Sequence, residues 1–218
     1  MAGLTVSVVP SSEPITLTEA KSHLRITGSG DDTLITSLIK AARTYAEEYT
    51  HRALMTQTIL LELDAFSDVN DPLWEGWKTG PYLNSYKNHI VLPRPPVQSV
   101  TSVITYDDAD AATTLASSKY YVDSAGEPAR VVLRTGETFP DALRVANAIR
   151  VTYVAGYASA GVVPDALKIG MLQHVTHLYE HRGDMYEAAA SNPPQLKSMY
   201  SAYVVYSGSG SSSLLAVG

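Results

Sequence analysis

The sequence predicts an α+β protein: a small helical bundle, built from two N-terminal helices and one long C-terminal helix, with an inserted antiparallel β domain and an extended C-terminal arm. Apolar residues recur every three or four positions before residue 50 and again after Pro164, which is the helical period. In between, apolar and β-branched residues alternate, as they do in strands. The expected divisions are residues 14–55 and 163–184 for the helical parts, 56–157 for the β domain and 193–218 for the arm.

Two short motifs mark the first helices. Thr16 and Glu19 stand three residues apart, the spacing of a capping box in which each side chain bonds the backbone amide of the other. We therefore expect a helix over residues 17–24. The turn-forming run TGSGDD then breaks the chain, and Asp31 or Asp32 can cap the next helix.

The second helix carries a long apolar stripe. Lys40, Arg43 and Glu47 fall outside this stripe. A stripe of this kind has to be buried against other helices or against another subunit. The residues expected to make these packing contacts are Leu34, Leu38, Ala42, Tyr45 and Tyr49.

The middle of the chain predicts an antiparallel β domain of about five to seven short strands. Residues 59–63 and 149–153 alternate in polarity, and residues 100–106 and 130–133 are rich in β-branched side chains. Clusters of Gly and Pro between these runs supply turns.

Helical period returns after Pro164, and proline suits the first turn of a helix. Apolar residues cover most of the circumference of the helix that follows. We expect it to be the central helix of the bundle, with Leu178 among its packing residues and Gly183 just past its end.

The C-terminal section predicts an arm that docks on another protein. Pro193 and Pro194 interrupt the helical pattern, and no acidic residue follows Glu187. An aromatic tail without carboxylates is poorly suited to water, and tyrosine is enriched where proteins meet. The residues expected to contact a partner are Leu196, Met199, Tyr200, Tyr203 and Tyr206.

Composition narrows the class of protein. Of the 218 residues, 45% are hydrophobic and 17% are charged, which is typical of a folded chain. The net charge of −6 argues against a general nucleic-acid binder, and the lack of cysteine excludes disulfides and thiolate metal sites. The N-terminus lacks the features of a signal peptide, and no apolar run approaches the roughly 18 residues of a membrane span. We therefore expect a soluble protein made in the cytoplasm, with no membrane partner.

One motif raises the question of zinc chemistry. His177, Glu180 and His181 fit H-x-x-E-H, the pattern of the inverted zinc metallopeptidases, and two histidines four residues apart share a helix face. A hydrolytic site also needs a third ligand, and only Asp184 and Glu187 follow, near the expected end of the helix. The bundle-packing interpretation is favoured over the zinc hydrolase, with His174 in or near the core.

Two other clusters favour structural roles. Residues 107–112, with sequence DDADAA, lack the full ligand series of a calcium loop and are expected to form a hairpin turn. The aromatic residues of the segment after the first long strand are expected to lie in a long loop packed on the β domain or on a neighbour; they are Trp74, Trp77, Tyr82 and Tyr86.

Several separated motifs, arriving in order, resemble one family. The stretch PITLTEAKSHLRI, then DDTLITSLIKAARTYAEEYTHRAL, LPRPPVQSVTSVITY and AIRVTYVAGYASAGVVPDALKIG are similar to the head–tail connector (adaptor) proteins of tailed bacteriophages, in the longer branch with a β insertion. In that family the third helix commonly ends in a stretch like His-Leu-Tyr-Glu-Asn-Arg, so His181 stands where asparagine is usual. The metallopeptidase pattern is then explained by one substitution in a packing helix.

The resemblance implies a mechanical function without catalysis. Such adaptors form a ring, commonly twelve-fold, beneath the capsid portal, and the C-terminal arm reaches the portal. The implied partners are the portal protein, tail or stopper (head-completion) proteins and further copies of the chain, with DNA passing through the channel without specific binding. The implied place is the virion neck, after assembly in the host cytoplasm, and no cofactor or metal is expected. The alternative is another neck component, such as a head-closure stopper or a tail-completion protein.

Overall fold

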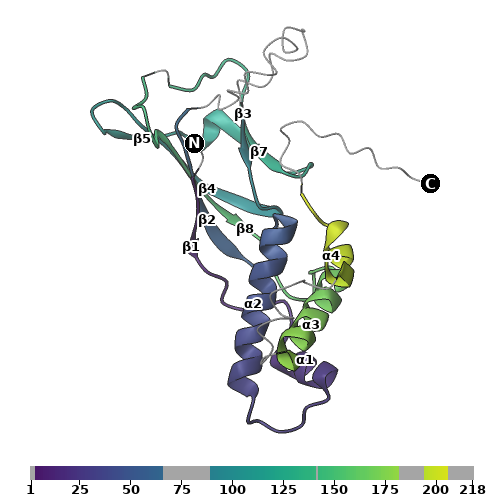
Figure 1. Cartoon of the computed structure of the whole chain (residues 1–218). Coiled ribbons are helices and arrows are strands. Elements are labelled where there is room, and N and C mark those ends of the chain that lie inside the picture. The colour runs from purple at the N-terminus through teal and green to yellow at the C-terminus, as the bar shows by residue number, and fades with distance from the viewer. Residues whose placement is uncertain (1–2, 66–88, 141, 182–193, 206–218) are drawn as a thin grey trace, which may run out of the picture. The chain divides into compact units, whose positions relative to one another are not determined.

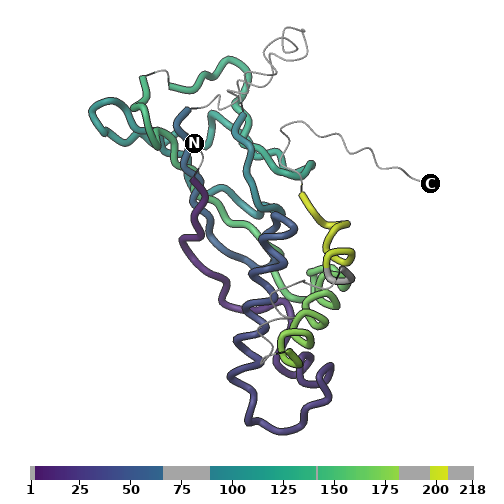
Figure 2. Tube along the Cα trace, viewed as in Figure 1, coloured from purple at the N-terminus to yellow at the C-terminus, as the bar shows by residue number. Residues whose placement is uncertain are grey.

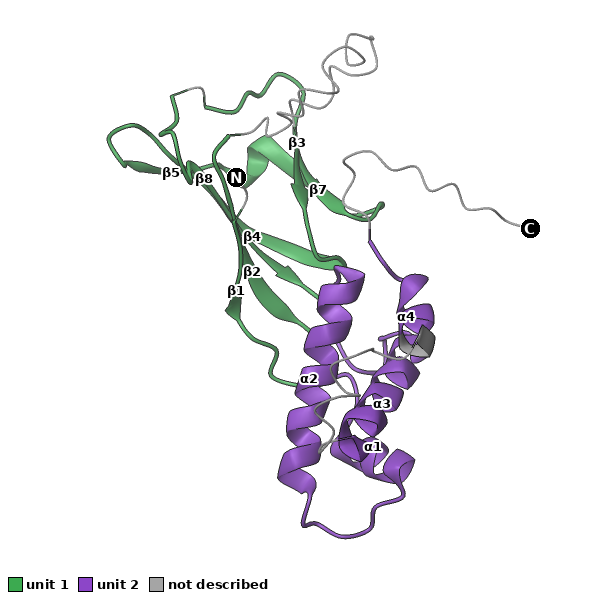
Figure 3. Cartoon of the chain, viewed as in Figure 1, with its two compact units in different colours: residues 1–12, 55–158 green, residues 13–54, 159–218 purple. Residues whose placement is uncertain are grey.

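The computed structural model describes residues 3–65, 89–140, 142–181 and 194–205. It is an α+β fold of helices and antiparallel sheets, as the sequence predicts (Figure 1). The chain divides into two compact units (Figure 3): a β unit of residues 1–12 and 55–158, and a helical unit of residues 13–54 and 159–218. The backbone trace in Figure 2 therefore enters the β unit twice and the helical unit twice.

The first helix of the helical unit, α1 (Leu17–Leu24), has the predicted bounds and the predicted capping box. The Glu19 amide donates to Thr16 Oγ1 at 3.1 Å, and the Thr16 amide donates to Glu19 Oε2 at 2.6 Å. Because the carboxylate accepts that amide bond, the pKa of Glu19 lies below its ordinary value. The helix start is thus fixed by its own first turn.

The longest helix, α2 (Asp32–Thr50), follows. Asp31 occupies its N-cap position, but its side chain makes no capping bond and instead accepts a hydrogen bond from the Tyr179 hydroxyl. The cap predicted from sequence is therefore replaced by a tie to another helix. The face of α2 that is fully buried carries Ile35, Ile39, Ala42 and Ala46.

Two further helices complete the unit, α3 (Asp165–Glu180) and α4 (Pro194–Ser201). Helix α3 contacts α1, α2 and α4, and α2 likewise contacts α1, α3 and α4, so the two long helices share the centre of the bundle. Its fully buried side chains are Leu167, Met171 and Val175. Gly183, the expected residue past its end, lies outside the described residues.

The described strands of the β unit form two antiparallel sheets. The five-stranded sheet has the order β1 (Gly3–Val8), β2 (Gln57–Leu63), β8 (Ile149–Ala155), β4 (Val97–Tyr106) and β5 (Ala112–Thr114). The three-stranded sheet has the order β3 (His89–Leu92), β7 (Ala129–Leu133) and β6 (Tyr120–Asp123), with a short 3₁₀ helix at Ser117–Lys119 before β6. Strand β1 was not predicted from the sequence.

The core of the β unit lies between the inner faces of these sheets. Alternate residues of each strand are buried, including Ile59 and Val151 in the larger sheet and Ile90 and Val131 in the smaller one. The hydroxyl of Tyr153 on β8 donates to the Pro93 carbonyl just after β3, at 2.6 Å. This bond joins the middle of the larger sheet to the chain that leaves the smaller one.

Among the helices described, none has the length and apolar character needed to span a membrane.

Candidate functional site

The helical unit holds an aromatic cluster to which α2, α3 and α4 all contribute. Tyr45 and Tyr49 of α2 lie with ring centroids 6.1 Å apart, and they lie 6.2 and 6.1 Å from the ring of Tyr200 on α4. His174 of α3 meets Tyr45 edge to face, with centroids 4.8 Å apart. Aromatic pairs attract at such separations, about 4.5–7 Å. The Tyr200 ring therefore packs α4 against α2.

A glycine on α3 makes room for Tyr200. A Cβ atom at Gly170 would lie 2.7 Å from Cε1 of the Tyr200 ring, which is closer than carbon atoms can approach. Gly170 and His174 are four residues apart, so they share one face of α3. The tyrosine ring thus packs directly on the α3 backbone, one turn from the histidine.

Two hydrogen bonds hold the segment that follows α4. The Arg52 side chain donates from Nε to the Tyr203 carbonyl at 2.6 Å, and the Val205 amide donates to the Thr50 carbonyl at 2.9 Å. The end of α2 and the end of the described arm are therefore joined side by side.

The cluster buries polar atoms at a cost in solvation. His174 is 4% exposed and Tyr200 is fully buried. Within the described part of the chain, His174 Nδ1 and the Tyr200 hydroxyl have no hydrogen-bond partner. Burial lowers the pKa of His174, with a smaller contribution from His177, and burial raises the pKa of Tyr200. Both groups are therefore neutral at pH 7.

Replacing Gly170 by alanine is expected to loosen α4. Alanine favours the helix by about 1 kcal/mol relative to glycine, but its Cβ displaces the Tyr200 ring. We expect Gly170→Ala to increase amide exchange over residues 197–205, measured by hydrogen–deuterium exchange. In a Tyr200→Ala background the clash is gone, and the same change should stabilise the chain. Equal effects of Gly170→Ala in both backgrounds would contradict the contact.

The residues predicted for packing differ in burial. Ala42 is buried, and Leu34 is 37% exposed. The others are half-buried, namely Leu38, Tyr45, Tyr49 and Leu178. The predicted stripe therefore begins with a leucine that is partly exposed, at 37%.

The residues predicted for partner contact are placed as follows. Tyr200 is fully buried inside its own helical unit, and Met199 and Tyr203 are half-buried. Tyr206 and the side chain of Leu196 lie outside the described residues. In this structure Tyr200 is an internal anchor, and the surface that α4 offers consists of its other residues.

Sequence reasoning missed a buried carboxylate on α2. Glu47, placed off the apolar stripe by its spacing, is 4% exposed. It accepts from Arg43 Nη1 at 2.8 Å and from the Leu54 amide at 2.9 Å, and Arg43 Nε also donates to Glu13 at 2.7 Å. The Glu47–Arg43 pair at four-residue spacing was the one signal for this contact. The network ties the segment before α1 and the segment after α2 to the middle of α2.

The H-x-x-E-H stretch lies at the end of α3. The rings of His177 and His181 are 4.5 Å apart, and His181 Nδ1 lies 2.9 Å from the His177 carbonyl. The described residues contain no group of three or more metal-binding side chains, and Asp184 and Glu187 lie outside them. His174 is in the core, as expected for a packing helix.

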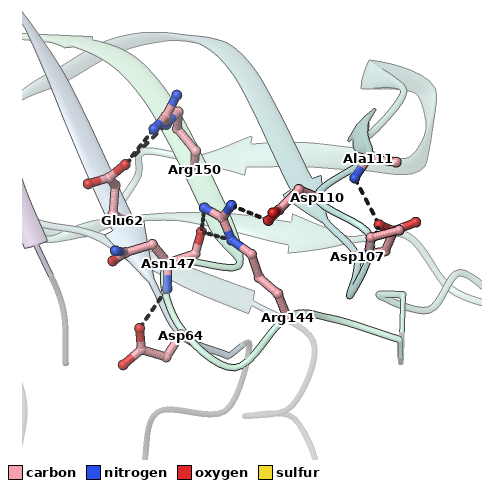
Figure 4. A network of polar contacts seen from close by, with 9 residues as sticks. Glu62, Asp64, Asp107, Asp110, Ala111, Arg144, Asn147 and Arg150 are labelled. Carbon is pink, nitrogen blue, oxygen red and sulfur yellow. Dashed lines mark hydrogen bonds and ion pairs between the residues drawn. The ribbon is translucent and has the colours of Figure 1, made fainter.

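A second polar network lies in the β unit (Figure 4). Arg150 pairs with Glu62 on the neighbouring strand at 2.8 Å, and Arg144 pairs with Asp110 at 3.0 Å. Asp107 Oδ1 accepts the Ala111 amide at 2.8 Å. The Arg150–Glu62 pair joins β8 to β2. The contacts of Asp107 and Asp110 lie in the turn between β4 and β5, which pair antiparallel. The hairpin predicted for residues 107–112 is confirmed.

The aromatic residues predicted for a long loop lie outside the described residues: Trp74, Trp77, Tyr82 and Tyr86.

These features define a class of chain: an α+β protein whose helical unit is interrupted by a β insertion and completed by a returning helix. The sequence profile of the phage gp6-like head-tail connector proteins matches residues 14–124, just over half of the chain. The protein therefore belongs to this family, as the motifs of the sequence indicated.

The fold is similar to solved structures of gene transfer agent (GTA) particles. A chain in the neck of an empty GTA particle, computed with C6 symmetry, has a TM-score of 0.70 and 22% identity over 96% of this chain and 98% of that one. A chain in the virion of a native GTA particle has a TM-score of 0.69 and 22% identity, and the match covers 95% of this chain and 98% of that one. A chain in the neck of a native GTA particle, computed with C12 symmetry, has a TM-score of 0.66 and 22% identity, and the match covers 97% of this chain and 98% of that one. At this identity the likeness shows the fold. No curated protein matches the sequence.

Proposed function

We propose that the protein is a structural subunit of a ring in the virion neck, which joins the capsid portal to tail or stopper proteins and surrounds the DNA channel. The observation that carries this proposal is the family match over residues 14–124. Twelve copies is the number that the family resemblance implies, and it is compatible with the similar chains found in necks computed with C6 and with C12 symmetry. The function requires assembly and docking, with no catalytic group, cofactor or metal.

Exposed apolar side chains support contacts between copies. In the helical unit, Leu34 is 37%, Ile169 is 47% and Val162 is 61% exposed. In a closed ring each copy meets its neighbours through two different patches. We expect these side chains to be among those that a neighbouring copy covers.

The charge of the chain supports a channel through which DNA slides. Protein that neutralises phosphates with Lys and Arg binds DNA with strong salt dependence. With 16 basic and 22 acidic residues, the chain has no basic excess to retain DNA. A ring of these subunits would let the DNA pass without specific binding.

The ring proposal is tested by mixing the purified protein with its portal protein and measuring particle mass, followed by imaging of any complex. We expect a symmetric ring on the portal. If the protein and its portal protein form no complex at any salt concentration, the ring proposal is contradicted.

The C-terminal arm (residues 193–218) is proposed to contact the portal. A deletion that tests this contact should leave Tyr200 in place, because Tyr200 also packs inside its own subunit. Deleting residues 193–218 also removes Tyr200 from its cluster and uncovers Tyr45 and Tyr49. Deleting only residues 206–218 keeps α4 and is the sharper variant. We expect this shorter deletion to weaken portal binding with an unchanged free energy of unfolding. Undiminished binding would exclude a role for that segment.

A further inference from the structure

The outward face of the three-stranded sheet carries an exposed tyrosine and arginine in contact. Along β7, Val131 and Leu133 are buried, so Val132 between them points away from the core. Tyr121 of β6 pairs in register with Val132 and is 47% exposed. The guanidinium carbon of Arg134 lies 5.9 Å from the centroid of the Tyr121 ring. These two residues and Val132 are called the sheet patch, and Tyr and Arg are the types enriched at the centres of protein interfaces.

The charge of this face suits a single carboxylate. Arg130 pairs with Asp123, and Lys119 pairs with Glu137 at 3.0 Å. Within the described part of the chain, no carboxylate pairs with Arg134. A nucleic-acid backbone is held by several cations together, whereas one unpaired guanidinium beside an aromatic ring fits one acidic side chain of a protein partner.

An unpaired carboxylate lies elsewhere on the same unit, in the turn between β4 and β5. Asp107 Oδ1 accepts two backbone amides of the turn, and Asp110 pairs with Arg144 (Figure 4). Asp108 lies between these two residues and is exposed. None of the described residues pairs with its carboxylate, so Asp108 remains available to a partner.

An exposed apolar side chain accompanies this turn. Arg144 pairs with Asp110 at 3.0 Å and donates to the Asn147 carbonyl at 2.7 Å, so the segment that carries Arg144 is held at the turn. Val145, the next residue, is 92% exposed. Asp108 and Val145 are called the turn patch, which offers one negative charge and one apolar group.

We propose that the turn patch of one copy docks on the sheet patch of the next copy in the ring. The Asp108 carboxylate then meets the Arg134 guanidinium, and Val145 packs against Tyr121. Figure 3 shows the turn beside β5 at one end of the β unit and β7 at the other. Each copy therefore has both halves of a head-to-tail contact, which is what a closed ring requires. The inference rests on the proposed ring and names a contact that joins its β units.

The two parts of this contact have different effects. A carboxylate on a guanidinium is directional, so it fixes how neighbouring copies are oriented. Covering Val145 and the Tyr121 ring removes apolar surface from water, which favours association. Because salt screens the attraction between exposed charges, we expect ring formation to weaken as the salt concentration rises.

Charge reversal tests the contact in full-length protein mixed with its portal protein. Arg134→Glu or Asp108→Lys alone places like charges opposite each other. We expect either variant to raise the protein concentration needed for half-maximal ring formation by about tenfold or more. The double variant Asp108→Lys/Arg134→Glu restores an opposite pair and should recover most of the loss. Particle mass and imaging measure ring formation.

Lys40→Glu provides the matched control, because it reverses an exposed charge on α2 and changes the net charge as Arg134→Glu does. It should form rings as the wild type does. Denaturant midpoints check that each variant is folded. Arg134→Gln and Asp108→Asn remove the attraction without adding repulsion, so they should give smaller losses and replace any reversal that unfolds.

The outcomes separate this contact from the ring itself. If the wild type forms no ring on the portal, the proposed function and this contact both fail. If the wild type forms rings and the folded single reversals form them equally well, or the double variant recovers nothing, the contact is wrong and the ring stands. If Arg134→Glu leaves the rings intact but weakens binding to a short DNA duplex, Arg134 contacts DNA, and the contact between copies is overturned.

Discussion

Replacing Gly156 by alanine is expected to destabilise the β unit by about 3 kcal/mol or more. Gly156 follows β8 with φ of +106°, a backbone conformation that residues with a side chain rarely adopt. A Cβ atom there would lie 2.1 Å from the Met55 carbonyl oxygen. Since the obstacle is backbone, no side-chain rotation can relieve it.

The surrounding hydrogen bonds make this position costly to move. The Gly156 amide donates to the Pro96 carbonyl at 2.8 Å, and the Gln98 side chain donates to the Gly156 carbonyl at 2.7 Å. Moving residue 156 away from Met55 breaks these contacts, which join the end of β8 to the start of β4. The clash therefore affects β8 and β4, two interior strands of the five-stranded sheet.

Gly136 provides the matched control. It has φ of +87°, but an added Cβ there would meet no atom within 4 Å. Gly136→Ala should therefore cost only the backbone strain, about 1 kcal/mol. Chemical denaturation of both variants measures the difference. If Gly156→Ala lowers the free energy of unfolding by no more than Gly136→Ala does, residues 55 and 156 do not approach each other as closely as the structure shows.

The parts of the fold that could be predicted are those encoded within a few residues. The capping box of Thr16 and Glu19 gave the start of the first helix, because both partners lie in one turn. The alternation around residues 59–63 and 149–153 likewise located β2 and β8, which pair directly. Strand β1 escaped prediction since its stability comes from pairing with β2, some fifty residues later.

The candidate site could be predicted less well. A tyrosine in the sequence does not indicate whether its own subunit or a partner protein will bury its ring. The aromatic, acid-free composition of the arm predicted that Tyr200 contacts a partner protein, but Gly170, Tyr45 and Tyr49 of the same subunit surround its ring. Glu47 looked like a solvent-facing helix residue until Arg43 and the Leu54 amide were found around it. In both cases the missing information was tertiary, and composition could not supply it.

Replacing Glu47 by alanine is expected to destabilise the helical unit by about 3 kcal/mol. The change leaves the Leu54 amide without its acceptor and removes one carboxylate from Arg43, whose side chain is only 13% exposed. Breaking one half of a buried ion pair typically costs about 3–5 kcal/mol. The remaining bond from Arg43 to Glu13 places the expected loss at the lower end.

The Glu62–Arg150 pair is the comparison that separates burial from simple pairing. It has a similar geometry, with Nη2 and Oε1 2.8 Å apart, but its side chains are 25% and 38% exposed. Glu62→Ala should therefore cost about 1 kcal/mol or less, as exposed pairs do. Glu47→Gln should lie between Glu47→Ala and the wild type, because the amide oxygen can still accept from Leu54 while the charge is lost. Denaturant midpoints of the three variants measure this order, and a Glu47→Ala loss no greater than that of Glu62→Ala would show that the α2 carboxylate is not a buried junction.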